Sequence, residues 1–357
     1  MTHYFKRGLY FLLYISCLLL IIPQTTYAED ELGDIGYSYK VIKPDNQISK
    51  AGYFDLRMTP DQKQTVELEL SNMTDQELGV DMSVHSAKTN SNGVIEYGPT
   101  KLKNDPSLVY DIADLVKVPE KVTLAPNETK NVPIEITMPS EQFDGYVSGG
   151  IYLQKSETEA DKKASEDAKG VINKYAYIVG MLLSETDTKL QPDLTFNKIY
   201  AGSSNYRNAF MVDFSNTVAA YVEGMTVDTR IYKKGSDEVL YESKKENYRM
   251  APNTSMIFPV NLNGEEFEAG DYEGHIIVTA GDKKWEWQEG FTITQKEADK
   301  YNAEDVSLIQ DRGINWQFIA MIAGGILAAL LVIYLLVRTL SNKKKKKKKK
   351  STKGKKK

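Results

Sequence analysis

Residue types that commonly perform catalysis are scarce in this chain of 357 residues. Its one cysteine, Cys17, lies in an N-terminal apolar run that we expect to be removed, so disulfides, cysteine-ligated zinc and thiol catalysis are excluded from the remaining chain. The two histidines beyond that run, His85 and His275, lie in segments that we predict to be separate modules. A metal site or an acid–base pair would require them to converge. We therefore expect surface histidines, no catalytic or metal-binding residue, no cofactor and no enzymatic activity.

The glycine-rich segment Gly145-Tyr146-Val147-Ser148-Gly149-Gly150 resembles a catalytic serine turn only superficially. Its spacing differs from Gly-x-Ser-x-Gly, and no helical pattern follows it. Close approach of another backbone segment, or a β-bulge, explains these glycines better. Acidic residues follow no Asp-x-Asp-x-Asp-Gly pattern, although a calcium site within Asp105–Asp114 stays open.

Aromatic residues are the other candidates, because an exposed ring can stack on the face of a sugar. Trp285 and Trp287 share one face of a predicted strand with Phe291, and this alternation predicts packing in the core. Tyr97 and Tyr110 lie in a segment rich in turn formers. These two tyrosines are therefore the better ligand candidates.

The charge of the chain is divided unevenly. The net charge is −4, but residues 1–28 and 338–357 hold 15 of the 45 basic residues and none of the 49 acidic ones. Residues 29–337 therefore carry a net charge of −19. A nucleic-acid partner for this central part is excluded, because nothing would offset the repulsion of the phosphates.

The N-terminus has the pattern of a secretory signal peptide. Lys6 and Arg7 precede an apolar stretch from Leu9 to Ile22, and small residues lead up to Ala28. Cleavage after Ala28 is predicted. The alternative, a lipoprotein with Cys17 at the end of a lipobox, is less consistent with the sequence because the apolar run continues past that cysteine.

A second apolar run, Trp316–Val337, holds no charge and is long enough to cross a hydrocarbon core about 30 Å thick. Trp316 and Tyr334 lie near its ends, where aromatic rings favour the membrane interface, and Arg338 and the lysines from Lys343 onward follow. This charge excess predicts a cytoplasmic C-terminus and an extracellular part at residues 29–313. No Leu-Pro-x-Thr-Gly sorting signal precedes the run, so we expect a single-pass protein of the cell membrane that keeps its anchor.

Alternation of apolar and polar residues dominates from residue 50 to 294. Val66, Leu68 and Leu70 alternate with polar residues, and residues 78–84 and 132–138 repeat the pattern. One apolar and one polar face is typical of antiparallel strands in a sheet solvated on one side. The sequence predicts an all-β fold of two tandem immunoglobulin-like β-sandwiches, followed by the C-terminal transmembrane helix.

The two predicted sandwiches share an internal repeat. Ala125–Ile136 matches Ala251–Leu262 at an offset of 126 residues, whereas Val66–Asn72 matches Phe210–Asn216 at an offset of 144. We interpret the modules as two copies of one topology. The change of offset places about 18 extra residues in the first copy, within Ser86–Pro119.

We predict that this extra segment projects from the first module and carries part of its ligand-binding surface. Asn92-Gly93 is typical of a tight turn and predicts a small hairpin. Pro106 followed by Leu108, Ile112 and Leu115 has helical spacing, with proline at the first helical position. The alternative is that this second half packs on the sandwich as a lid over the core.

Residues 155–170 are charged and poor in apolar side chains, and we interpret them as the loop of a long hairpin whose return strand lies within Lys174–Ser184. The predicted organisation is a signal peptide (1–28), a first sandwich (29–185), a second sandwich (186–295), a stalk (296–315), a transmembrane helix (316–337) and a polylysine tail (338–357).

Several motifs follow one another through the chain: Tyr53-Phe54-Asp55-Leu56, Ser71-Asn72, Asn92-Gly93-Val94-Ile95-Glu96-Tyr97, Leu124-Ala125-Pro126-Asn127-Glu128-Thr129, Phe143-Asp144-Gly145-Tyr146-Val147-Ser148-Gly149-Gly150-Ile151 and Asn173-Lys174-Tyr175-Ala176-Tyr177. This set resembles the WxL-interacting proteins of low-GC Gram-positive bacteria. The chain itself has no Trp-x-Leu motif, so it resembles the anchoring protein. The one departure is Pro60-Asp61, where the family pattern has Pro-Gly.

The resemblance implies a peptidoglycan-binding first module and a host-binding second module, with family boundaries near residues 155 and 165. It implies a membrane-anchored cell-surface scaffold whose partners are peptidoglycan, WxL-domain surface proteins and a host extracellular protein. The alternative is a cell-wall-modifying enzyme or a carbohydrate-binding surface receptor. The candidate ligand-binding residues are Asn92, Gly93, Tyr97, Tyr110, Phe143, Asp144, Gly145 and Tyr146, and the candidate anchor residues are Trp316, Tyr334, Arg338 and Lys343.

Overall fold

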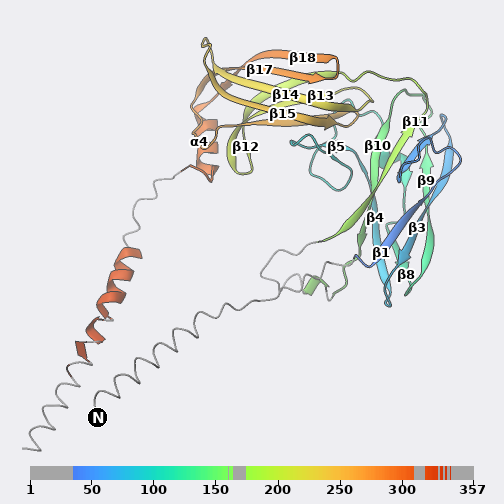
Figure 1. Cartoon of the computed structure of the whole chain (residues 1–357), viewed down its shortest axis with the longest axis horizontal. Helices are drawn as coiled ribbons and strands as arrows, with labels where there is room; N and C mark the ends of the chain where they lie inside the picture. The colour runs from blue at the N-terminus through green and yellow to red at the C-terminus, as the bar shows by residue number, and fades with distance from the viewer. Residues whose placement is uncertain are drawn as a thin grey trace, which may run out of the picture.

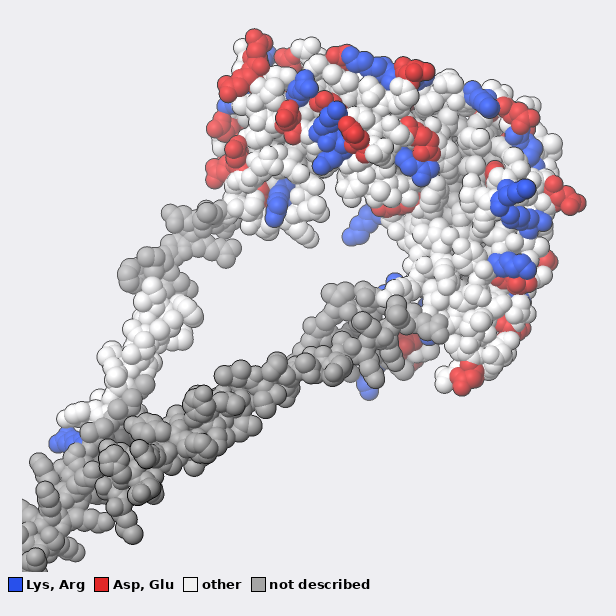
Figure 2. Space-filling model, in the orientation of Figure 1, with Lys and Arg blue, Asp and Glu red and all other residues white. Residues whose placement is uncertain are grey.

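The computed structural model describes residues 35–159, 161–163, 174–308, 318–328, 330–332, 334, 335 and 338. The described residues between 35 and 308 form two β-sandwich modules that meet at a corner (Figure 1). The predicted all-β fold is therefore confirmed for this part of the chain. On the face shown in Figure 2, acidic and basic side chains are interspersed over both modules.

The first module consists of two sheets and a small hairpin. The strands of its four-stranded sheet, in spatial order, are β1 (Tyr37–Ile42), β3 (Lys63–Asn72), β9 (Thr129–Thr137) and β7 (Val116–Lys117). The strands of its five-stranded sheet are β2 (Phe54–Arg57), β11 (Ala176–Ser184), β10 (Val147–Lys155), β4 (Leu78–Ser86) and β8 (Lys121–Leu124). In that sheet β11 pairs antiparallel with β10 and parallel with β2.

The second module has a three-stranded and a four-stranded sheet. The strands of the first are β12 (Leu194–Ser204), β13 (Arg207–Asn216) and β16 (Thr254–Asn261). The strands of the second are β15 (Val239–Met250), β14 (Val222–Lys233), β17 (Gly270–Ala280) and β18 (Lys283–Ile293). Every pairing within these two sheets is antiparallel.

Alternating burial builds one apolar core in each module. Along β9 the inward residues Val132, Ile134 and Ile136 are buried, whereas their neighbours are exposed. Trp285 and Trp287 lie half-buried on β18 and pack against the core of the second module. The predicted core packing of the two tryptophans is therefore confirmed.

The internal repeat is confirmed at the level of strand register. Leu68 on β3 pairs with Val132 on β9, and Val212 on β13 pairs with Phe258 on β16, at the predicted offsets of 144 and 126. The strand order β15-β14-β17-β18 of the second module corresponds to β8-β4-β10-β11 of the first.

The repeated Ser-Asn motif forms the same hydrogen bonds in both modules. Asn72 Nδ2 donates to the carbonyls of Gln76 at 2.7 Å and Ala125 at 2.9 Å. Asn216 Nδ2 donates to the carbonyls of Ala220 at 2.7 Å and Ala251 at 2.9 Å. We call this arrangement the asparagine clamp, because one side chain holds two loops at the same end of each sandwich.

The extra segment of the first module lies between β4 and β8, where the change of offset places it. It contains the predicted small hairpin, formed by β5 (Lys88–Thr89) and β6 (Ile95–Glu96), followed by the short helix α2 (Ile112–Leu115) and β7. The helix begins at Ile112 with Asp111 as its N-cap, so the predicted start at Pro106 is wrong. The physical reason is that Asp105 Oδ1 accepts hydrogen bonds from the amide and hydroxyl of Ser107, which hold residues 105–108 in a turn.

The stalk predicted for residues 296–315 begins instead with a helix that packs on the second module. This helix is α4 (Gln295–Glu304), which begins with a capping box between Thr294 and Glu297. Ala298 is buried in the core of the second module, and the backbone amide of Asn208 donates to Asp305 just after the helix. This part of the chain is therefore docked on the second sandwich.

The predicted signal peptide, Trp316 and Lys343 lie outside the described residues. Tyr334 and Arg338 are described as exposed helical residues, as are residues 318–328, 330–332 and 335. Within the part of the chain that the structure describes, no helix is both long and apolar enough to cross a membrane.

Candidate functional site

The extra segment of the first module does not project into solvent. Its hairpin packs against β15 and β16 of the second module (Figure 1), where Thr89 Oγ1 lies 2.7 Å from Thr254 Oγ1 and accepts from the amide of Ala251 at 3.0 Å. The amide of Arg249 donates to the carbonyl of Gly93 at 3.0 Å. The predicted projection is therefore wrong, because the polar groups of the hairpin find buried partners on the second module.

The second half of the segment reaches the second module through Asp105. This side chain is 7% exposed, and its Oδ2 accepts a hydrogen bond from Ser215 Oγ at 2.5 Å. Next to it, Asn253 Nδ2 donates to the carbonyl of Ser107 at 3.0 Å. Ile112, in contrast, is fully buried in the core of the first module. The half that we predicted as helix therefore both covers that core and joins the modules.

The glycine-rich segment forms the third contact between the modules. The amide of Tyr146 donates to the carbonyl of Ala219 at 2.8 Å. Gly145 has a φ of +87°, and a Cβ atom there would lie 2.2 Å from the same carbonyl oxygen. Cβ atoms on Gly149 and Gly150 would lie 2.4 Å and 2.8 Å from the carbonyls of His85 and Tyr97. The prediction that close backbone approach explains these glycines is confirmed.

These contacts surround a cleft of about 660 Å³ that we call the tyrosine cleft. Its wall includes Tyr53, Tyr97 and Tyr146 of the first module and Tyr221 of the second. Tyr53 and Tyr146 are 41% and 38% exposed, so their rings are open to a ligand. The ring centroids of Tyr146 and Tyr221 lie 6.1 Å apart. Both modules therefore contribute to the cleft.

The polar groups of the tyrosine cleft are ordered by hydrogen bonds. Tyr221 OH lies 2.5 Å from Ser148 Oγ and 3.5 Å from Tyr97 OH. At the rim, Arg249 forms a bidentate ion pair with Glu223, at 2.5 and 2.7 Å. Burial raises the pKa values of Tyr53 and Tyr221, so both phenols stay neutral and can donate hydrogen bonds. The cleft therefore offers aromatic faces and neutral hydroxyls.

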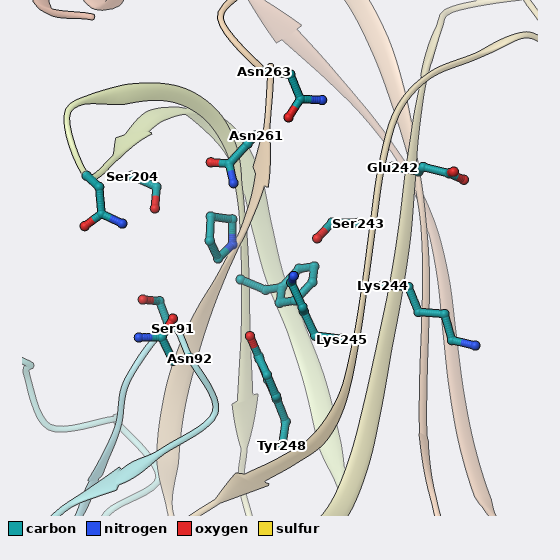
Figure 3. Close-up of a pocket in the computed structure, with 13 residues that line it drawn as sticks. Ser91, Asn92, Ser204, Glu242, Ser243, Lys244, Lys245, Tyr248, Asn261 and Asn263 are labelled. Carbon is teal, nitrogen blue, oxygen red and sulfur yellow. The ribbon is translucent and has the colours of Figure 1, made fainter. Parts of the chain in front are cut away.

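A second, more polar pocket of about 440 Å³ lies where the tip of the β5–β6 hairpin faces the second module (Figure 3). Asn92 lies on the hairpin side, and Asn261, Lys245 and Tyr248 lie on the other side. Gly93 packs closely against the ring of Tyr248 at the edge of this pocket. A Cβ atom at this position would lie 2.2 Å from the ring, so only glycine fits.

The eight predicted ligand-binding residues do not gather in one site. Tyr97 and Tyr146 line the tyrosine cleft, and Asn92 and Gly93 lie at the polar pocket. The remaining four residues are Tyr110 and Phe143, whose rings lie 5.4 Å apart against the core, Asp144, which accepts from Thr186, and Gly145, at the junction.

Several residues of the cleft were not predicted. Tyr53 directly precedes β2 and lies next to the fully buried Phe54, but its own side chain is 41% exposed. Tyr221, Glu223 and Arg249 come from the second module. No local pattern in the sequence places these three beside the first module.

His85 and His275 lie in different modules and have different hydrogen-bond partners. His85 Nε2 lies 2.8 Å from Ser83 Oγ, and burial lowers the pKa of His85. His275 pairs with Glu286 at 2.7 Å on the second module. Among the residues that the structure describes, no group of three or more His, Cys, Asp and Glu side chains could hold a metal ion, and this includes residues 105–114.

Two family models match the chain. Residues 37–155 match the peptidoglycan-binding domain of the WxL-interacting proteins, and residues 166–303 match their host-binding domain. The chain belongs to the WxL-interacting protein family. In this WxL-interacting protein the residues of the peptidoglycan-binding match form half of the wall of the tyrosine cleft, and those of the host-binding match form the other half. The host-binding match includes β11, although that strand lies in the sheet of the first module.

Beyond this family, the chain resembles solved structures only at low sequence identity. A search of curated protein sequences found no match. Solved structures that resemble the WxL-interacting protein include the E. coli chaperone DraB (13% identity, 68% of this chain and 96% of that chain covered, TM-score 0.27) and the class 5 fimbriae chaperone CfaA (12%, 72% and 98%, TM-score 0.28). A third is the Pseudomonas aeruginosa chaperone CupB2 (11%, 65% and 95%, TM-score 0.27). Likeness at these TM-scores carries no argument about function.

Proposed function

We propose that this protein is a membrane-anchored surface scaffold that binds peptidoglycan in the tyrosine cleft and uses its second module to bind proteins. The observation that carries the proposal is the cleft itself, lined by tyrosines and lying mainly on the first sandwich, which contains the peptidoglycan-binding match. Its volume of about 660 Å³ suits a short glycan or a muropeptide segment.

The chemistry of the cleft favours a neutral, hydroxyl-rich ligand. The exposed rings of Tyr53 and Tyr146 offer apolar faces on which a pyranose ring can stack. The hydroxyls of Tyr97, Tyr221 and Ser148 can exchange hydrogen bonds with sugar hydroxyls and amide groups. The net charge of −19 over residues 29–337 opposes long-range attraction to anionic wall polymers, so binding relies on contacts shorter than the Debye length of about 8 Å.

The partners proposed for the second module are WxL-domain surface proteins and a host extracellular protein. The family assignment supports this division, because the second module matches the host-binding domain. The proposed anchor is the apolar run Trp316–Val337, with the lysine-rich tail in the cytoplasm. This arrangement would hold both modules on the outer side of the membrane.

The variants Tyr53→Ala and Tyr146→Ala are expected to weaken binding to peptidoglycan about tenfold each, since each removes a stacking surface of roughly 1 kcal/mol or more. The measurement is co-sedimentation of the purified protein with isolated peptidoglycan over a range of protein concentrations. Tyr175→Ala is the matched control, because Tyr175 is 50% exposed on the same module but does not line the cleft. Unchanged binding by both cleft variants, or an equal loss in the control, would reject the site.

Membrane anchoring is tested by fractionating Gram-positive cells that express the chain. Full-length protein is expected with the membranes, and a variant that ends at residue 315 is expected in the wall fraction or the medium. The reason is that only the full-length chain contains an apolar run long enough to span the bilayer. Full-length protein released together with wall material would contradict the proposed anchor.

A further inference from the structure

A buried lysine lies inside the extra segment of the first module. Lys88, the first residue of β5, is only 7% exposed. Lysine is almost never buried unless its amine has a partner. Here Nζ donates to Oδ1 of Asn104, sixteen residues further along the chain. The amine is therefore in direct contact with the carboxamide group of an asparagine.

The same carboxamide contacts a carboxylate on its other side. Asn104 Nδ2 donates to Asp111 Oδ2 at 2.8 Å. The second oxygen of Asp111 accepts from Ser86 Oγ at 2.5 Å and from the amide of Ala113 at 2.9 Å. These bonds fix the direction of the carboxylate. An amine, a carboxamide and a carboxylate are thus held in sequence by residues that are distant in the chain.

The surroundings favour a reactive amine. Burial lowers the pKa of Lys88, and the charges of Asp111 and then Asp105 act in the opposite direction. A larger fraction of neutral amine, the nucleophilic form, follows from the net lowering. A small cavity of about 150 Å³ is lined by Lys88, Asn104 and Asp111, which leaves room for a departing group. Asn104 also borders solvent, so that group can escape.

We propose that Lys88 and Asn104 join through an isopeptide bond that the folded chain forms by itself, with Asp111 as the catalytic proton carrier. The bond would connect Nζ of Lys88 to Cγ of Asn104. This modification is independent of the proposed ligand site, because it needs only the three side chains.

The reaction balances without a co-reactant. The lysine ammonium gives one proton to the Asp111 carboxylate, and the lone pair freed on Nζ attacks Cγ of Asn104, which becomes tetrahedral. The Cγ–Nδ2 bond then breaks, and its electron pair leaves with Nδ2. Asp111 passes its proton to Nδ2, then takes the second proton from Nζ and passes that proton to Nδ2 as well. The leaving group therefore departs as ammonium, and Asp111 returns to a carboxylate. Nothing is oxidised or reduced.

The bond would close a loop that contains the contact between the modules. Residues 88 to 104 include Thr89 and Gly93, which bond to the second module. A covalent link at the base of this loop restricts the unfolded chain in the way that a disulfide does, but in a module without cysteine.

The test is the intact mass of the purified full-length chain under denaturing conditions, followed by peptide mapping with trypsin. We expect a mass lower than that of the same unlinked chain by one ammonia molecule, and one branched peptide that joins Lys88 to Asn104. Trypsin does not cut after an acylated lysine, so cleavage after Lys88 should be lost. Asn92-Gly93 can also lose ammonia by cyclisation. The branched peptide distinguishes the two reactions, and Asn92→Ala should leave it unchanged.

Variants separate the three roles. Lys88→Arg and Asn104→Ala should abolish the branched peptide, whereas Lys103→Arg, the matched control one residue before Asn104, should retain it. Asp111→Asn keeps an effective N-cap for α2 and should fold without forming the link. Asn104→Asp should form the link with loss of water instead of ammonia. The full unlinked mass with a free Lys88 in the wild-type chain would overturn the proposal, and a branched peptide that persists in Asp111→Asn would remove Asp111 from it.

Discussion

Replacing Phe210 by alanine is expected to lower the free energy of unfolding of the second module by about 3–5 kcal/mol. Phe210 is 1% exposed on β13. Its ring centroid lies 5.1 to 5.6 Å from those of four other aromatic residues, which are Phe267, Tyr272, Phe291 and Tyr241. Truncation would leave a cavity at the centre of this cluster. A loss of this size is a large fraction of the stability of an ordinary domain, which is about 5–15 kcal/mol.

Denaturant unfolding followed by tryptophan fluorescence measures this loss. Two of the three tryptophans, Trp285 and Trp287, pack on the core of the second module, so the signal reports that module. Val239→Ala on the edge strand β15 is the control, because Val239 is 40% exposed and its truncation should cost less than about 0.5 kcal/mol. A Phe210→Ala protein as stable as this control would show that the ring cluster does not hold the sheets together.

Replacing Gly145 by alanine is expected to cost roughly 3 kcal/mol or more and to weaken peptidoglycan binding together with stability. A left-handed backbone conformation, at a φ of +87°, disfavours any residue with a Cβ atom. The new Cβ atom would in addition lie 2.2 Å from the carbonyl oxygen of Ala219 in the second module. Relief of that clash must move the modules apart, next to Tyr146 and Tyr221 of the cleft.

The matched control for this variant is Gly235→Ala. Gly235 has a φ of +79°, but nothing lies within 4 Å of the position of its Cβ atom. Gly235→Ala should therefore lower the free energy of unfolding only by the backbone strain, roughly 1–2 kcal/mol, and leave peptidoglycan binding unchanged. Thermal unfolding and co-sedimentation with peptidoglycan measure the two effects. Equal losses of stability in both variants, with binding intact, would show that the junction tolerates the extra methyl group.

The elements of both modules follow from local patterns in the sequence. A strand that alternates in polarity can bury only one set of side chains, so Val132, Ile134 and Ile136 predict both the strand and its inward face. The internal repeat also predicted which strands correspond in the two modules. Its two different offsets locate the extra segment between β4 and β8. The same logic placed Trp285 and Trp287 against the core.

The junction could not be predicted in the same way. Pro106 satisfies a helix-start pattern, but the side chain of Asp105 bonds to Ser107 and to Ser215 of the other module and keeps this stretch in a turn. Tyr221 and Arg249 belong to the second sandwich and line the cleft only because the two sandwiches meet there. Such contacts between distant residues leave no periodic signal, so the sequence predicted Tyr97 and Tyr146 but not their partners.

The asparagine clamp has a consequence for the history of the molecule. Asn72 and Asn216 bond to equivalent carbonyls, and the Pro-Asn turns that complete the clamp place Asn127 and Asn253 at φ values of +57° and +51°. Two copies that share so local a device point to tandem duplication of one ancestral gene segment. The hairpin at residues 88–96 exists in only one copy, so it was gained or lost after that event. The cleft between the modules is then younger than either of the folds that form it.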